Sequence, residues 1–271
     1  MNLILIGRSS FIATHIASAS ASSDVLSKQF SRDDHFESGL GSGDVVINCA
    51  LSPRYSVERY KEDHDIDLAI ARRANYLGAR VVMLSTRRVY SAARRWNAQE
   101  DGVESGDETA YGQNKAITEQ AILSMDSRNA VLRLSNVFGM EFCAGRPRNT
   151  FFGIMLRRLK EEDVIQFDMS YNTLRDFIPV ELCAKAIIRF VQSTDAGVIN
   201  LGAGFPTRCG DLASWVIKGY GRGRLQVDSP IARDEFYLNS ALWTSKFGRI
   251  CEPIELKNYC IDIGRQLKCV K

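Results

Sequence analysis

The 271-residue chain is predicted to adopt an α/β fold, with a doubly wound parallel sheet and a smaller, partly carboxyl-terminal lobe. Two observations predict this fold. Short apolar runs alternate with segments of helical period along the first two thirds of the chain. A glycine turn directly follows the first apolar run and opens a helical pattern, as expected where a strand of a parallel sheet leads into a helix. The apolar content of 45% is ample for a core of this size.

The first predicted strand is the apolar run NLILI at residues 2–6, and GRSSFIA follows it at residues 7–13. A strand, a glycine turn and a helix in this order bring backbone N–H groups and a helix amino terminus to a pyrophosphate. The run is predicted to be a strand and not a signal sequence, because no basic residue precedes it and Arg8 soon interrupts it. The residues predicted to bind a dinucleotide cofactor here are Gly7, Ser9, Ser10, Phe11 and Ile12.

The second predicted strand covers residues 25–30, and Arg32 follows it. In dinucleotide folds an acidic residue at this point binds the ribose hydroxyls, whereas an arginine accommodates the 2′-phosphate of NADP. Arg32 therefore favours NADP(H). The alternative is a carboxylate displaced by one or two residues, supplied by Asp33 or Asp34, so that NAD(H) stays possible.

The following strands are predicted from further apolar runs. Residues 45–47 form a strand buried on both faces, and Asn48, Cys49 and Ala50 at its end are expected to lie along the cofactor. Leu134, at the end of a later strand, is expected to line the same cofactor. The other elements predicted in this half are a helix at 60–76, a strand at 80–85, a polar loop at 90–109 that could cap the next helix with Glu104 or Asp107, a helix at 111–124 and a strand at 129–134.

Tyr111 and Lys115 lie four residues apart at the start of a predicted helix, so both side chains share one face. A phenol, with a pKa of about 10, is a poor acid or base at neutral pH, but a nearby ammonium lowers that pKa. Thr86, at the end of the strand before the loop, can hydrogen-bond the same substrate oxygen. These three residues can move a proton to or from a carbonyl or alcohol while a hydride is transferred. Alone, the pair is also common on a solvated helix face.

Six motifs occur in order along the chain: GRSSFIA at 7–13, DVVINCA at 44–50, LSTRRVY at 84–90, YGQNK at 111–115, LRLSNVFG at 132–139 and RDFIPV at 175–180. With them the chain resembles the extended short-chain dehydrogenases/reductases, the NAD(P)-dependent enzymes that act on nucleotide sugars, as in polysaccharide biosynthesis. The resemblance implies a Rossmann domain at 1–142 and 172–201. It also implies a substrate-binding lobe at 143–171 and 202–271, built in part from a helix at 151–160 and a strand at 164–167.

The resemblance also implies roles for individual residues. Thr86, Tyr111 and Lys115 are the implied catalytic group, with Lys115 also touching the cofactor ribose. Two helices of the family commonly form a dimer, which places Asp65 and Asp67 at the surface or at that interface. The residues implied to bind the nucleotide-sugar substrate are Thr86, Arg87, Asn136, Asn149 and Arg175, where the arginine at 175 contacts the nucleotide diphosphate.

The glycine turn departs from the family pattern G-x-x-G-x-x-G. Ser10 and Ala13 replace the second and third glycines. Alanine is a small change for helix packing, whereas the second glycine normally lets the backbone approach the phosphates closely. The Ser10 hydroxyl can itself hydrogen-bond a phosphate oxygen, so we expect cofactor binding to persist.

The residues after Thr86 distinguish three reactions. Dehydratases of the family carry an Asp-Glu pair there as acid and base, and this chain has Arg87 and Arg88. Dehydration is therefore disfavoured. Together with Arg32, the pattern predicts an NADP(H)-dependent reductase of a nucleotide-linked 4-keto sugar. An NAD-dependent epimerase is the alternative, and a non-catalytic dinucleotide-binding regulator is a third possibility.

The net charge and the cysteine content limit the classes of partner and the compartment that the sequence predicts. A net charge of +3, with basic residues scattered along the chain, is too mild to indicate nucleic acid. No apolar run approaches the roughly 20 residues that cross a bilayer, so no membrane association is expected. Seven cysteines without a C-x-x-C pair indicate reduced thiols in a cytoplasmic protein. Three scattered histidines give no basis for a metal site.

The remaining predictions are a helix at 180–192, a strand at 198–201 and a final helix from Glu252.

Overall fold

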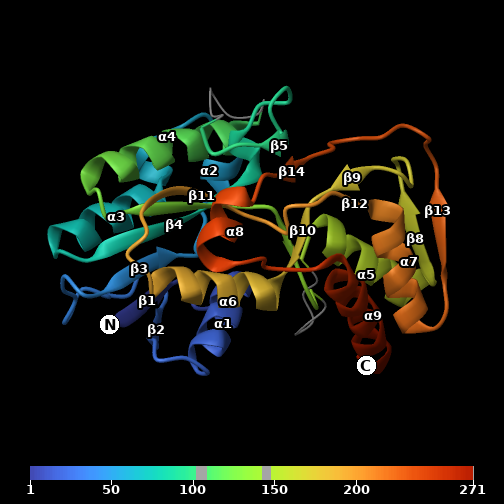
Figure 1. Ribbon diagram of the computed structural model, residues 1–271, viewed down its shortest axis with the longest axis horizontal. Helices are drawn as coiled ribbons and strands as arrows, with labels where there is room; N and C mark the ends of the chain where they lie inside the picture. Colours follow the sequence, from blue (N-terminus) through green and yellow to red (C-terminus); the bar gives the residue numbers. More distant parts are fainter. Residues whose placement is uncertain (102–108, 142–147, 271) are drawn as a thin grey trace.

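The computed structural model describes residues 1–101, 109–141 and 148–270. Its centre is a six-stranded, fully parallel sheet in the order β2-β1-β3-β4-β6-β11 (Figure 1). The strands of this sheet are β1 (Asn2–Ile6), β2 (Leu26–Phe30), β3 (Val45–Asn48), β4 (Arg80–Thr86), β6 (Ala130–Leu134) and β11 (Gly197–Leu201). The strand order reverses between β1 and β3. The predicted doubly wound α/β class is thereby confirmed.

Helices cover both faces of the sheet (Figure 1). α1 (Phe11–Ser20) packs beside α6 (Val180–Val191) on one face, and α3 (Ile66–Tyr76) beside α4 (Ala110–Met125) on the other. The inner strands β1, β3, β4 and β6 are buried on both faces, as their continuous apolar runs require. The edge strand β2 has the polar sequence LSKQF and is mostly exposed. The dimer interface expected on two helices stays a prediction.

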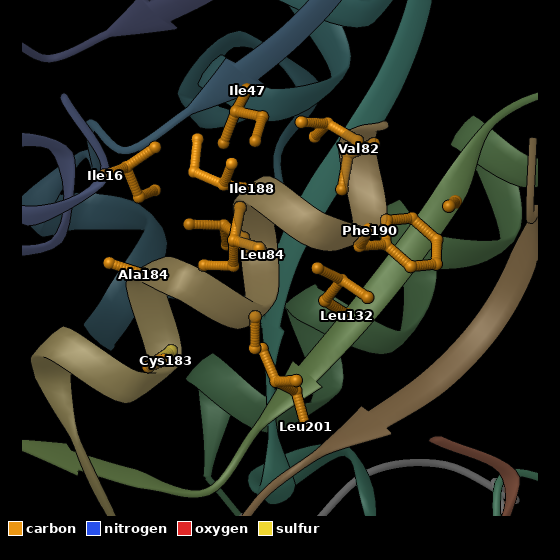
Figure 2. Packing of buried hydrophobic residues seen from close by; sticks show 14 of the residues in the cluster. Ile16, Ile47, Val82, Leu84, Leu132, Cys183, Ala184, Ile188, Phe190 and Leu201 are labelled. Carbon is orange, nitrogen blue, oxygen red and sulfur yellow. The ribbon is translucent and has the colours of Figure 1, made fainter. Parts of the chain in front are cut away.

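The core on one face forms where strand leucines meet α6. Leu84, Leu132 and Leu201 come from the adjacent strands β4, β6 and β11 and pack with Ile188 and Phe190 of that helix (Figure 2). All five side chains are at most 8% exposed. Burial of this kind contributes about 1.5–3 kcal/mol for each large apolar side chain. The sheet and α6 therefore form one rigid support for the strand ends.

Two helix starts show why the chain folds locally as it does. α3 begins at Ile66, later than the predicted residue 60, because the Asp65 carboxylate accepts a hydrogen bond from the Leu68 N–H at 2.9 Å and caps the helix there. A 3₁₀ turn, Glu62–His64, fills the preceding residues. α9 (Pro253–Cys269) begins as predicted, directly after Glu252, which forms a capping box.

Thr109 caps α4 by accepting a hydrogen bond from the Gly112 N–H at 3.2 Å. The two residues predicted to cap this helix, Glu104 and Asp107, lie outside the described residues. The helix predicted at 111–124 is confirmed by α4. It starts one residue earlier than predicted, at Ala110.

A second apolar cluster lies to the right of the sheet in Figure 1. It contains α5 (Phe151–Glu162), β8 (Val164–Phe167), α7 (Cys209–Tyr220), β13 (Arg224–Val227) and α9. The predicted helix at 151–160 and strand at 164–167 are confirmed. α7 and α9 pack so closely that a Cβ at Gly219 would lie 1.9 Å from the Ile261 carbonyl oxygen. Glycine, which has no Cβ, allows this approach. The predicted division of the chain into two domains stays a prediction.

Short elements connect the sheet with this second cluster. β7 (Asn136–Phe138) pairs with β10 (Phe177–Pro179), and β9 (Leu174–Arg175) pairs with β12 (Thr207–Arg208). β5 (Trp96–Ala98) pairs with β14 (Tyr237–Leu238), ahead of α8 (Ala241–Phe247), whose Trp243 and Phe247 join the core beneath the sheet. A short helix, α2 (Pro53–Val57), follows β3, and a 3₁₀ turn, Arg87–Val89, follows β4. Among the described helices, none is long and apolar enough to span a membrane.

Candidate active site

The glycine turn after β1 lies against the end of β3, where the strand order reverses. Gly7 has φ +90°, and a Cβ on it would lie 2.8 Å from the Ala50 nitrogen. Only glycine fits this position without a shift of the backbone. The Cys49 N–H donates to the Ile6 carbonyl at 2.8 Å, which holds the two strand ends together. Gly7, Cys49 and Ala50 are therefore neighbours, as their predicted cofactor roles require.

Ser10 precedes α1 as its N-cap residue, and its side chain makes no capping hydrogen bond. The backbone N–H groups of the first turn of α1, among them those of Phe11 and Ile12, therefore keep their capacity to bind an anion. Ala13 is fully buried, so a small residue is what the packing of α1 needs there. These features fit a dinucleotide, with Gly7 allowing the close turn and the Ser10 hydroxyl free to meet a phosphate oxygen.

Arg32 lies after β2 at a separate cavity of about 660 Å³. Its side chain is 53% exposed and makes an ion pair with Asp33 at 3.3 Å. Asp34 instead accepts a hydrogen bond from the Ser31 N–H at 2.6 Å and holds the turn. Of the two alternative ribose-binding carboxylates, Asp33 lines this cavity with Arg32, and Asp34 is already used by the backbone.

Thr86 and Tyr111 line one cleft of about 230 Å³ at the carboxyl end of the sheet. Leu134, the last residue of β6, and Asn136, the first of β7, line it too, and Ile12 reaches it from α1. Five residues singled out from four separate motifs therefore meet around one space. Parallel strands all end at the same edge, which is why residues so far apart in sequence come together.

Lys115 lies behind Tyr111 and is only 4% exposed. Its Nζ donates to Oδ2 of Asp67 at 2.7 Å and to the Leu84 carbonyl at 3.0 Å, and it lies 6.0 Å from the centre of the Tyr111 ring. The expectation that Asp65 and Asp67 are surface or interface residues is wrong. Both are buried, at 2% and 6% exposure, because Asp65 caps α3 and Asp67 is the counter-ion of Lys115.

Asn48 is the third member of this buried group. Its Nδ2 donates to Oδ1 of Asp67 at 2.8 Å and to the Ala50 carbonyl at 2.9 Å, while its Oδ1 accepts from the Ala50 N–H. Asn48 thus connects the end of β3, beside the glycine turn, with the pair of Asp67 and Lys115. Its predicted place along the cofactor stays a prediction.

Two predicted substrate-binding arginines are held by one late segment. Arg87 donates to both carboxylate oxygens of Asp234, at 2.8 Å for the Nη1 bond, and its guanidinium lies 3.9 Å from the centre of the Phe236 ring. Arg175 donates to the backbone carbonyls of Asp234 at 3.1 Å and Arg233 at 3.0 Å. Neither lines the cleft that contains Tyr111.

Asn149 is exposed and does not itself line that cleft, although the residues on either side of it do. The neighbouring polar residues that do line it were not singled out from the sequence. Glu141 is buried, accepts a hydrogen bond from the Thr150 hydroxyl and lies 3.5 Å from Arg148. Burial raises the pKa of the Glu141 carboxyl. The Arg148 guanidinium in turn lies 4.4 Å from the centre of the Phe11 ring. Residues 139–150 carry no helical or strand period in the sequence, so no sequence signal marked these residues.

The chain is similar to a known protein family and to several solved structures. The model of a protein family described as the NAD dependent epimerase/dehydratase family matches residues 10–202. A UDP-N-acetylglucosamine 4-epimerase from Bacillus cereus is 15% identical over 99% of both chains, with a TM-score of 0.78. An NAD-dependent NDP-hexosamine 5,6-dehydratase involved in tunicamycin biosynthesis is 18% identical over 98% of this chain and 97% of its own, with a TM-score of 0.75.

A dTDP-4-dehydrorhamnose reductase from Clostridium acetobutylicum is 16% identical over 99% of this chain and 100% of its own, with a TM-score of 0.74. At these identities the similarity to solved structures shows the shared fold. Two further structures of this fold contain ligands: one holds UDP-glucuronic acid with NAD, and another holds NADPH.

Proposed function

The chain belongs to the NAD dependent epimerase/dehydratase family, enzymes of the extended short-chain dehydrogenase type, and we propose that it is an NADP(H)-dependent reductase of a nucleotide-linked 4-keto sugar. The observation that carries the proposal is the common cleft of Thr86 and Tyr111, with Lys115 buried behind the tyrosine. This arrangement supplies a proton donor and a second hydrogen bond for one substrate oxygen.

In this proposal the nicotinamide ring, when bound, supplies the hydride. Tyr111 donates its phenolic proton to the carbonyl oxygen of the keto sugar as that oxygen gains negative charge. The Thr86 hydroxyl donates a hydrogen bond to the same oxygen and stabilises the developing charge. Lys115 holds a positive charge close to the phenol and would hydrogen-bond the ribose of a bound cofactor.

The surroundings of Thr86 disfavour dehydration. Loss of water needs an acid and a base beside the sugar, and Arg87, the next residue, is bound at both ends of its guanidinium by Asp234. The backbone N–H of Arg88 donates to the Thr86 hydroxyl oxygen at 3.3 Å, and its guanidinium lies 3.8 Å from Asp234. Neither arginine can supply the acid and base pair found in the dehydratases.

A second cavity supports a nucleotide-linked substrate. It has a volume of about 340 Å³ and shares Phe151 with the cleft that contains Tyr111. Phe151 lies at the junction of the two spaces, and the guanidinium of Arg175, which lines neither of them, lies 5.1 Å from the centre of its ring. In this proposal the sugar occupies the first space and the nucleotide the second, with Arg175 close to the diphosphate between them.

Arg32 supports NADP(H), since an exposed guanidinium at the end of β2 is suited to a 2′-phosphate. The alternative, an NAD-dependent epimerase, would use the same Tyr111 and Lys115 to remove and return the hydroxyl proton at one carbon, while NAD accepts and returns the hydride. A dinucleotide-binding regulator without turnover is the third alternative.

The experiment that tests the proposal incubates the purified chain with NADPH or NADH and a panel of nucleotide-linked 4-keto sugars, and in parallel with NAD⁺ and the corresponding nucleotide sugars that carry a hydroxyl at C4. A reductase oxidises one equivalent of cofactor for each sugar reduced. An epimerase interconverts two nucleotide sugars with no net oxidation, and a regulator binds cofactor without converting any sugar. The Tyr111→Phe variant is the control for reactions that do not use the cleft. Epimerisation without net cofactor oxidation would overturn the proposal.

A further inference from the structure

Lys115 is held by a carboxylate from a different helix. Asp67 of α3 and Lys115 of α4 form an ion pair of 2.7 Å, and the two side chains are only 6% and 5% exposed. A second Lys115 hydrogen bond goes to the Leu84 carbonyl of β4. Two of the three ammonium N–H groups are thereby fixed, and within the part of the chain that the structure describes the third is left for other partners.

The carboxylate is itself oriented. Asn48 donates from its Nδ2 to the Asp67 oxygen that does not face Lys115, at 2.8 Å. Because the same amide is tied to Ala50, the carboxylate is fixed relative to the end of β3 and the glycine turn. The position of the ammonium is therefore set by three elements at once, β3, α3 and β4.

We propose that Asp67 is a positioning residue of the reaction, whose carboxylate keeps the Lys115 ammonium charged and fixed beside Tyr111. The proposal rests on the proposed function for its catalytic consequence. The charge argument stands on the geometry alone, since a buried ammonium without a counter-ion is strongly disfavoured.

Burial alone would lower the pKa of Lys115, but the Asp67 carboxylate raises that pKa above its ordinary value. Asp67 is the only carboxylate among the described residues that pairs with this lysine. Other ionisable groups surround the pair from each neighbouring element. They are Tyr55 of α2, with its ring centre 5.9 Å from Nζ, Cys49 after β3, Asp65 before α3 and Tyr111 of α4.

The first test measures the free energy of unfolding of the full chain by urea between about pH 7 and 10, and it needs no ligand. In Asp67→Asn, the folded pKa of Lys115 falls below its unfolded value, so the unfolded state binds more protons and stability should rise with pH. The wild type should show no such rise. The double variant Asp67→Asn/Lys115→Met should lose the rise, because it removes the titrating group.

Asp65→Asn is the matched control. Asp65 is a buried carboxylate two residues away that binds Leu68, Thr118 and Tyr60 and does not pair with Lys115. Its loss should lower stability without creating a rise that depends on Lys115. If Asp67→Asn and the wild type have parallel stability curves over this pH range, Asp67 does not keep the lysine charged.

The second test measures binding of NADPH and NADH by the same variants. Asp67→Asn should weaken binding at least about tenfold at pH 8–9, since a hydrogen bond from a charged group to the ribose is lost. The loss should shrink at pH 6, where Lys115 regains its proton, and Asp67→Glu should restore binding. Unchanged binding in a folded Asp67→Asn would overturn the positioning role. A wild type that binds neither cofactor would overturn the proposed function, and the stability test would still decide the charge of Lys115.

Discussion

The guanidinium of Arg87 and the carboxylate of Asp234 form a two-point ion pair between residues that lie 147 positions apart. Arg95 adds a hydrogen bond of 3.1 Å to the same carboxylate. Asp234 adopts a φ of +53°, in the left-handed region, so its backbone is adapted to this contact. The pair fastens the segment after β13 to the end of β4, one residue from Thr86.

We expect Asp234→Ala to destabilise the fold by about 3–5 kcal/mol, because it leaves the Arg87 charge buried without a partner. Arg87 is 7% exposed. Urea unfolding at neutral pH measures the change. Asp168→Asn is the control, since its carboxylate is 86% exposed and pairs with the exposed Arg233, at 3.6 Å. A loss no greater than that of the control would show that the Arg87 pair is not a structural tie.

The pair also predicts a pH dependence. Burial alone would raise the pKa of Asp234, but the hydrogen bond and charge of Arg87 hold that pKa below its ordinary value. The folded state therefore binds fewer protons than the unfolded state, and the stability that Asp234 contributes above its unfolded pKa is lost as pH falls through its folded pKa. The stability difference between wild type and Asp234→Asn should shrink as the pH is lowered below about 4.

The stability that depends on Asp176 should change with pH in the opposite direction to that of Asp234. Burial raises the pKa of this fully buried carboxyl to about 6, although the N–H groups of Ala203, Gly204 and Leu238 donate to it. The folded state binds more protons than the unfolded state between about pH 4 and 6. Stability is therefore lost as pH rises through this window, by about 3 kcal/mol in all.

The measurement for Asp176 is the difference in unfolding free energy between Asp176→Asn and the wild type across pH 4 to 6. The difference should move in favour of the variant by about 3 kcal/mol, because asparagine does not titrate. Asp262→Asn, which removes an exposed carboxylate paired with Arg265, should give a constant difference. A constant difference for Asp176→Asn as well would show that its carboxyl titrates normally.

The sequence predicted the sheet and its helices well, because their signals are local. NLILI, VVIN and AVLRL are short buried strands, and Gly7, Tyr111 and Glu252 mark ends that the structure confirms to within a residue. The environment of single charged residues was not predictable in this way. Asp67 looks like an exposed helix residue until α4 brings Lys115 against it, 48 positions later.

Arg87 illustrates the same limit. Next to Thr86 in sequence, it was expected to bind substrate, yet its guanidinium points to Asp234, which no local pattern connects with it. Asp34 seemed equivalent to Asp33 as a ribose ligand until the turn placed it on the Ser31 N–H. Tertiary contacts decide which charges are free, and these contacts depend on the whole topology.

Cofactor preference should depend on Arg32. We expect Arg32→Asp to reverse a preference for NADPH over NADH, because it removes the counter-charge of the 2′-phosphate and adds repulsion. Lys28→Asp is the control, since it makes the same charge change on an exposed residue of β2, the strand that precedes Arg32, away from the cavity of Arg32. Dissociation constants for both cofactors measure the effect. A wild type that binds NADH more tightly than NADPH would contradict the expected role.

Arg175→Ala should mainly raise the KM for the nucleotide sugar, with kcat far less affected, if this arginine binds the diphosphate in ground state and transition state alike. It should also cost about 1–3 kcal/mol of stability, since two backbone carbonyls lose a donor. Arg208→Ala is the control, on the strand that pairs with β9 and 58% exposed. An unchanged KM in a folded Arg175→Ala would remove this residue from the substrate site.

The last prediction concerns the order of effects at the catalytic residues. Tyr111→Phe keeps the ring but removes the proton donor, so single-turnover reduction of a substrate found in the panel should slow about 10²–10⁴-fold with cofactor binding unchanged. Lys115→Met should lose activity and cofactor affinity together, and also stability, because Asp67 is left buried without its counter-ion. Thr86→Val should be mildest, since it removes one hydrogen bond of about 0.5–1.5 kcal/mol. Tyr60→Phe, whose hydroxyl binds Asp65 outside the cleft, is the matched control. A folded, cofactor-bound Tyr111→Phe that reduces substrate at the wild-type rate would show that Tyr111 and Lys115 are only neighbours on one face of α4.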